Sequence, residues 1–270
     1  MIYAFAVVIG AFSGLLSGLL GIGGGVAVVP LLSYAFAITH APIPADMVMH
    51  YAVGTSLATM VFSTLSASFF QHKKKAVLWP LFWYIVPGTV LGGLLGGFIA
   101  DSFSSRFLKI CFAAFCVFIS LLFFRKEPVE GSAEEKQKQS LRIPKYALTV
   151  IGVFIGTIAG MLGVGGGLLL IPLLVMLHFS LPQASALSVS CTLPTVIAGT
   201  VSAIYFGWDA PPIDLPSIGY VIWPIALTQG IVSVLTAKLG VHITHTLPRY
   251  YLRKLFATLL LCIAWLMLAV

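Results

Sequence analysis

The sequence predicts an all-α polytopic membrane protein, built from two inverted-topology repeats of about five hydrophobic segments each. Three observations lead to this prediction: the composition, a duplicated glycine motif and the placement of charged loops. Of the 270 residues, 59% are hydrophobic and 9% are charged, and the first charged residue is Asp46. One helical span needs about 20 apolar residues. Because so few charged residues could not cover a soluble core, the composition indicates a protein embedded in lipid.

Ten apolar segments follow one another along the chain, five in each half, and Pro and Gly mark many of their ends. They cover residues 3–20, 24–38, 50–71, 77–99 and 106–124, then 146–162, 166–179, 184–206, 217–237 and 252–269. The polar stretch between the halves has the composition of a solvated linker. The sequence therefore predicts a first transmembrane repeat at 1–124, a charged cytoplasmic linker at 125–145 and a second repeat at 146–270.

The two halves carry the same glycine motif. GLLGIGGGVAVVPLL from Gly18 and GMLGVGGGLLLIPLL from Gly160 align without gaps at an offset of 142, with nine of fifteen positions identical. Such self-similarity indicates a tandem duplication. Further downstream the alignment pairs Ser56 with Ser188 at an offset of 132. Upstream, glycines recur at every fourth residue, a pattern typical of closely packed membrane helices.

Loop charges predict that the halves have opposite orientations. The HKKK loop at 72–75 is basic, whereas its equivalent, GWDAPPIDLPS at 207–217, has two acids and no base. Cytoplasmic loops carry the excess of Lys and Arg. Each half must then make an odd number of net crossings, as three spans plus a glycine-rich pair that enters and leaves on one side would do. This topology places both termini outside and the linker in the cytoplasm.

Each glycine motif is predicted to break a helix pair near the membrane midplane, and the sequence leaves open whether the arms are re-entrant or span fully. Non-helical backbone is tolerated there only when it is buried in protein or lines a hydrated cavity. The helix that restarts after the glycines has free N–H groups and a positive dipole end, which attract anions. Nearby hydroxyls could donate to an oxyanion, or instead bond between helices. The candidate substrate-binding residues are Gly21, Gly23, Gly24, Gly25, Thr55, Ser56, Gly163, Gly165, Gly166, Gly167, Ser188 and Ser190.

The twin GxGGG motifs, each followed by Pro-Leu-Leu, together with AVGTS from Ala52, resemble the TauE/SafE family of sulfite exporters and related anion permeases. The resemblance implies transport of sulfite, sulfoacetate, thiosulfate or another small sulfur-containing or organic anion across the bacterial cytoplasmic (inner) membrane. It also implies substrate contacts from Gly23 to Gly25 with Thr55 and Ser56, and from Gly165 to Gly167 with Ser188. The second half departs from the GTS pattern, because it has Ala-Leu-Ser at 186–188.

The remaining motifs argue against an enzyme. The first glycine motif has Val26 where a dinucleotide-binding G-x-G-x-x-G needs its third glycine, and no Gly-Lys-Ser or Gly-Lys-Thr occurs. His242 and His245 have no nearby carboxylate or Cys, so we expect no metal site and no cofactor. The net charge of +7 comes from loops at segment ends, so we expect no nucleic-acid partner.

We therefore expect a transporter, most consistent with an exporter, that works by alternating access around a central oxyanion site. The competing interpretation is a non-transporting membrane scaffold or assembly subunit whose glycines serve only helix packing. The sequence does not determine which anion is transported, in which direction, or whether transport is coupled to protons or sodium. It also leaves open whether the protein forms a homodimer.

Overall fold

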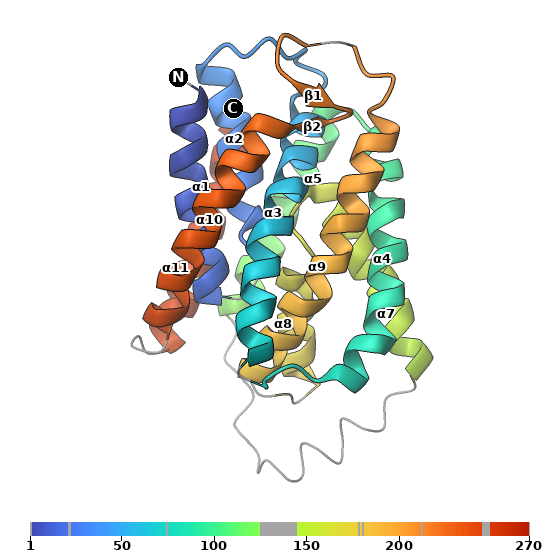
Figure 1. Ribbon diagram of the computed structural model, residues 1–270, viewed down its shortest axis with the longest axis vertical. Coiled ribbons are helices and arrows are strands. Elements are labelled where there is room, and N and C mark those ends of the chain that lie inside the picture. The colour runs from blue at the N-terminus through green and yellow to red at the C-terminus, as the bar shows by residue number, and fades with distance from the viewer. Residues whose placement is uncertain are drawn as a thin grey trace.

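The computed structural model describes residues 2–20, 23–73, 75–124, 145–177, 179, 181–211, 213–244 and 249–269, and almost all of them are helical (Figure 1). The elements of the first half are α1 (Ile2–Leu20), α2 (Gly25–Ile38), α3 (Val48–Lys73), α4 (Trp79–Ser102) and α5 (Ser105–Phe124). Those of the second half are α7 (Lys145–Leu162), α8 (Gly167–Met176), α9 (Leu181–Phe206), β1 (Ser217–Ile218), β2 (Val221–Ile222), α10 (Trp223–Thr244) and α11 (Arg249–Ala269). The all-α polytopic fold class is thus confirmed.

Five of the described helices are long and apolar enough to cross a membrane: α1, α3, α4, α5 and α9. The outer surface is apolar as well. Large side chains are strongly exposed along several helices, among them Trp83, Phe98, Tyr205, Leu235 and Trp265. Because a soluble protein rarely exposes so much apolar surface, this surface is suited to contact lipid tails.

Two helices are too short to span a membrane. The helix α2 has 14 residues and α8 has 10, whereas a span needs about 20. In Figure 1, α1 begins and α2 ends at the end of the molecule that also holds the end of α11 and the strands. The starts of α7 and α9 lie at the opposite end. The pairs α1–α2 and α7–α8 therefore open toward opposite ends.

The helices of the two halves are interleaved. The most extensive contacts join α1 to α10 and α4 to α7, and α3 packs on α9 and α5 on α11. Glycines permit the first two contacts. A Cβ on Gly10 would lie 2.7 Å from the Cα atom of Gln229, and one on Gly152 would lie 2.7 Å from the carbonyl oxygen of Ile85. Both interfaces therefore use small residues for close approach, as the glycine spacing predicts.

Helix α10 begins later than its predicted segment at 217–237, so the first residues of that prediction are wrong. Residues Ser217–Ile218 and Val221–Ile222 instead pair as antiparallel strands. Gly219, with a φ of 57°, supplies the left-handed residue that the tight turn needs. Pro224 lies in the first turn of α10, where its missing N–H costs no helical hydrogen bond.

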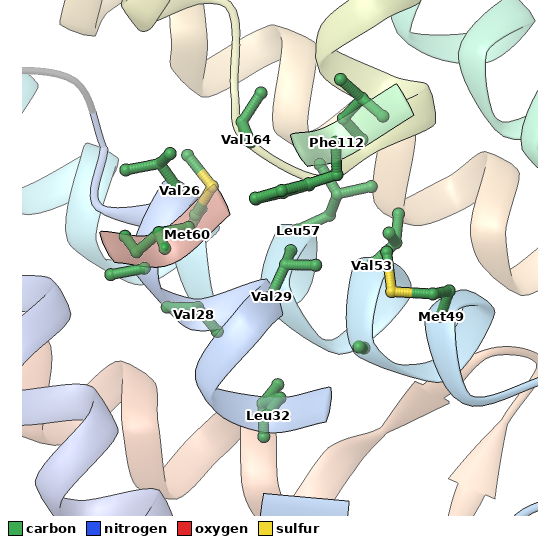
Figure 2. Close-up of a cluster of buried hydrophobic side chains, with 14 of the residues drawn as sticks. Val26, Val28, Val29, Leu32, Met49, Val53, Leu57, Met60, Phe112 and Val164 are labelled. Atoms are coloured by element: carbon green, nitrogen blue, oxygen red, sulfur yellow. The ribbon is translucent and has the colours of Figure 1, made fainter. Parts of the chain in front are cut away.

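A buried apolar cluster surrounds the first turn of α2. Figure 2 shows Val26, Val29, Leu57, Met60 and Val164 within this cluster. They come from α2, α3 and the segment between α7 and α8. The core thus extends to both glycine motifs and fixes where they lie.

Candidate functional site

The two glycine motifs form turns between helices, and four of their residues have left-handed backbone. Positive φ angles occur at Gly23 (82°), Gly24 (77°), Gly163 (67°) and Gly165 (71°). A side chain would strain the backbone at each of these positions, because its Cβ would crowd a carbonyl oxygen. The turns therefore need glycine at four positions.

The other glycines of the motifs have different roles. Gly25 and Gly167 are the first residues of α2 and α8. Gly166 precedes α8 with a right-handed φ of −64°, and a Cβ there would meet only the Cγ2 atom of Ile155, at 3.3 Å. Gly21 lies outside the described residues.

The two turns touch one another in the interior. A Cβ on Gly25 would lie 2.7 Å from the carbonyl oxygen of Gly163. A Cβ on Gly23 would lie 2.6 Å from the Met60 Cε atom and 3.5 Å from the Thr192 Cγ2 atom, and one on Gly165 would contact the same two side chains. Met60 and Thr192 thus lie where the turns of both halves meet.

Both short helices point their N-termini toward this meeting point. Gly24, Gly25, Gly166 and Gly167 are all buried. The first N–H groups of a helix lack helical acceptors, and the helix dipole places positive partial charge there. Two such helix starts, with no charged side chain in either glycine motif, make an interior region of positive potential.

Serine hydroxyls from the two longest helices hold the turns. Ser56 in α3 donates to the carbonyl oxygen of Gly163 at 2.9 Å, across the boundary between the halves. Ser188 in α9 donates to the carbonyl oxygen of Gly167 at 3.0 Å. Both hydroxyl protons are therefore engaged by the turns, while the hydroxyl oxygens stay beside the helix starts.

Two predicted site residues make their hydroxyl contacts elsewhere. The Thr55 hydroxyl accepts a hydrogen bond from the Ile222 amide at 3.1 Å, next to the start of α10. The Ser190 hydroxyl donates to the Ala186 carbonyl oxygen at 2.9 Å and accepts from Ser68 at 3.2 Å. The structure thus gathers most of the predicted glycines with Ser56 and Ser188, and ties Thr55 and Ser190 into other contacts.

Sequence reasoning missed the role of Met60. Met60 and Thr192 are separated by 132 residues, the same offset that pairs Ser56 with Ser188. This repeat-equivalent spacing was the available signal. A flexible Met side chain can fill an irregular gap between two turns.

A separate group of titratable residues lies at the end of the molecule that holds the strands. The Tyr220 hydroxyl donates to the Asp101 Oδ1 atom at 2.7 Å. Burial, together with the hydrogen bond and negative charge of Asp101, raises the pKa of Tyr220 well above its ordinary value. The buried His50 ring contacts Tyr220 at 5.1 Å between ring centroids. Among the described residues, no three His, Cys, Asp or Glu side chains are grouped to hold a metal ion.

Comparison with known proteins shows the family of this chain. The sequence profile of the family described as "Sulfite exporter TauE/SafE" matches residues 6–267. This chain belongs to the TauE/SafE family. A Haemophilus influenzae protein named "Probable membrane transporter protein" is 29% identical over 256 residues, covering 95% of this chain and 94% of its own.

Two further relatives come from other organisms. A Methanocaldococcus jannaschii protein, "Probable membrane transporter protein MJ0441", is 29% identical over 94% of this chain and 91% of its own. The Bacillus subtilis protein "Probable membrane transporter protein YunE" is 27% identical over 77% of this chain and 80% of its own. No solved structure matches the chain significantly. The TauE/SafE protein described here is therefore a multi-pass protein of a membrane transporter family.

Proposed function

We propose that this TauE/SafE protein moves a small sulfur-containing or organic anion, such as sulfite, thiosulfate, sulfoacetate or a similar sulfonate, across the bacterial cytoplasmic membrane. The observation that carries the proposal is the meeting of two helix N-termini, those of α2 and α8, at the buried glycine turns. Opposed half-helices with their positive ends at a central site are a frequent design of secondary transporters. Amide and hydroxyl donors suit an oxyanion, since they attract it without placing a full charge in lipid.

Alternating access requires that the two turns separate. In the described conformation Gly25 and Gly163 are in contact, and the Met60 side chain closes the space beside them. We infer that this is an occluded conformation. Movement of the α1–α2 pair relative to the α7–α8 pair would open the site first to one side and then to the other.

The proposal includes an inverted repeat with both termini outside and the linker in the cytoplasm. The inverted repeat is supported by the opposite openings of the two helix pairs and by matching interfaces. The choice of sides rests on the basic loop at 72–75 and its acidic equivalent at 207–217. At one interface Gly10 contacts Gln229, and at the other Gly152 contacts Ile85, which is the same pairing with the halves exchanged.

Export is the direction we propose. A negative cell interior drives an anion outward by about 2.3 kcal/mol per charge for each 100 mV. A carrier without ion coupling would therefore suffice for export, whereas uptake would need a second energy source.

A membrane scaffold is the competing function, and one observation favours it. The Ser56 and Ser188 hydroxyls donate to backbone carbonyl oxygens, as they would in a site built only for packing. The two functions differ in what the amides at the helix starts do, because only a transporter exposes them to an anion during its cycle.

Flux through purified protein in liposomes tests the proposal. Vesicles are loaded with sulfite, thiosulfate, sulfoacetate or sulfate in turn, and efflux is followed with and without a membrane potential and a pH gradient. Protein-free vesicles and vesicles with heat-denatured protein are the controls. We expect saturable efflux of at least one sulfur oxyanion. Efflux equal to the controls for every anion would leave the scaffold as the better account.

A further inference from the structure

A set of buried polar side chains lies between α1, α3 and α10, outside the predicted site. Ser13 and Ser17 belong to α1, Thr59 to α3 and Gln229 to α10, and each of the four is 0% exposed. In the part of the chain that the structure describes, the Ser13 and Ser17 hydroxyls and the Gln229 Nε2 atom have no hydrogen-bond partner. Unsatisfied buried polar groups are rare in folded proteins and call for an explanation.

These side chains border the first glycine turn. A Cβ on Gly24 would lie 3.0 Å from the backbone carbonyl carbon of Ser13 and would contact its hydroxyl oxygen. On the other side of the turn, Ser63 donates to the carbonyl oxygen of Gly23 at 3.1 Å. Ser63 lies one helical turn after Thr59 on α3, and the Thr59 hydroxyl lies 3.0 Å from the Gln229 Oε1 atom. The polar set therefore reaches the turn along both α1 and α3.

Turning the Gln229 amide around does not satisfy it. The Thr59 hydroxyl also contacts the Thr55 carbonyl oxygen at 2.9 Å, and a hydroxyl has one proton to donate. If that proton serves Thr55, the flipped amide donates one of its two N–H bonds to Thr59. Its carbonyl oxygen then takes the place of the unpartnered Nε2 atom, so one end of the amide lacks a partner among the described residues in either orientation.

At the equivalent positions around the α4–α7 interface, the side chains are apolar. Offsets of 142, 132 and 144 place Ile155 opposite Ser13, Cys191 opposite Thr59, and Ile85 opposite Gln229. The last pairing follows from contacts, because Gly10 meets Gln229 as Gly152 meets Ile85. Packing alone is therefore satisfied by apolar side chains at these positions, and the polar set serves another purpose.

We infer that Gln229 and Ser13 donate hydrogen bonds to the transported oxyanion, which binds beside Gly24 on the side of α1, α3 and α10. The Ser13 hydroxyl is a neutral donor next to the positive end of α2, and the Gln229 amide lies beside Thr59, one helical turn of α3 from the residue that bonds Gly23. Neutral donors near a positive helix end select an anion with exposed oxygen atoms over a cation. The site is then asymmetric, with its side-chain contacts supplied by the polar set and not by the equivalent residues Ile155 and Ile85. This inference rests on the proposed function and names the residues that give it specificity.

The test replaces the donors with side chains of similar volume or with the residue of the other half. The variants are Gln229→Leu, Gln229→Ile and Ser13→Ala. Ser120→Ala is the matched control, since Ser120 is equally buried but donates to the Ala257 carbonyl oxygen at 2.9 Å, between α5 and α11. Each protein is reconstituted, and the apparent KM and maximal rate are measured for sulfite, thiosulfate and sulfoacetate. Unfolding temperature is measured in detergent with and without each anion.

We expect Gln229→Leu and Ser13→Ala to raise the apparent KM about ten-fold or more for the transported anion, as loss of a hydrogen bond to a charged group does. The unfolding temperature without anion should stay level or rise, because an unsatisfied buried group has been removed. Stabilisation by the anion should weaken, while Ser120→Ala keeps the wild-type KM.

The experiment distinguishes failure of the proposed function from failure of the inference about Gln229 and Ser13. If the wild type moves none of the anions, the proposed function itself fails. If the wild type transports but KM and anion-dependent stabilisation are unchanged in all three donor variants, the inference is wrong. Should Gln229→Leu fail to fold, Gln229→Ile decides the question, since Ile85 already packs in the equivalent interface.

Discussion

Gly25 and Gly163 lie so close together that a Cβ on Gly25 would be 2.7 Å from the carbonyl oxygen of Gly163. The two residues belong to different copies of one duplicated motif, and they are 138 positions apart. Duplication has therefore placed the two turns in direct contact. Any movement that opens a path between the halves must act on this contact.

Neighbouring glycines in the second turn should differ sharply in their tolerance of a side chain. Gly165 has a φ of 71°, and its Cβ would contact Met60, whereas Gly166 has a right-handed backbone. A left-handed non-glycine residue costs about 1–2 kcal/mol. We expect Gly165→Ala to lower anion flux about ten-fold, since strain of that size depopulates the turn, and Gly166→Ala to keep near wild-type flux. Efflux from proteoliposomes with matched protein content checks both variants.

Met60 should act as the seal between the turns. Met60→Ala removes the side chain that a Cβ on Gly23 would approach to 2.6 Å. We expect a loss of stability of about 2–5 kcal/mol, as for other large-to-small changes in a core. We also expect a higher basal leak of anions, measured as non-saturable efflux.

Met49→Ala is the control for that effect. Met49 is equally buried in α3, but its sulfur contacts the Ser33 hydroxyl at 3.4 Å and not the glycine turns. The Met49→Ala variant should lose a similar amount of stability without an increase in the basal leak of anions. Equal leak from both variants would mean that general loosening of α3, and not a seal, explains the result.

The sequence predicted most helix positions because the apolar runs and the Pro and Gly residues between them are local signals. The lengths of these apolar runs also predict the short arms around each glycine motif, since too few residues separate the motif from the next loop to make a full span. The prediction for 217–222 was wrong because Val221 and Ile222 extend an apolar run that does not distinguish a short strand from the start of a helix.

The site was predicted only in outline. The two GxGGG motifs have the same sequence pattern but different backbone conformations, since Gly24 is left-handed and its equivalent Gly166 is right-handed. The unpartnered state of Ser13 and Gln229 depends on how α1 packs against α10, more than 200 residues away in the chain. Such long-range pairing leaves no local pattern. The binding roles of the glycines and hydroxyls stay predictions.

The two serines that hold the turns should contribute unequally to stability. Gly167 is the first residue of α8, so its carbonyl oxygen also lies in position to accept a helical hydrogen bond. Gly163 lies just after the end of α7, outside a helix. We expect Ser56→Ala to cost about 1–3 kcal/mol, because it leaves a buried carbonyl oxygen without its donor, and Ser188→Ala to cost ~1 kcal/mol. Thermal unfolding in detergent measures both. A larger loss for Ser188→Ala would contradict the proposed difference.

Alkaline pH should loosen the strand hairpin through Tyr220. Its hydroxyl must stay protonated to donate to Asp101, and burial beside that carboxylate raises the pKa of Tyr220 above the ordinary 10.0. A folded-state pKa above the unfolded one gives stability that is fully present below about pH 10 and is lost as pH rises through the folded-state value. Tyr220→Phe removes the hydroxyl and should therefore flatten the decline in unfolding temperature above pH 10. The difference in this decline between wild type and Tyr220→Phe is the informative quantity, because the two proteins differ only in the Tyr220 hydroxyl. Parallel declines in the two proteins would show that the bond between Tyr220 and Asp101 does not hold the hairpin.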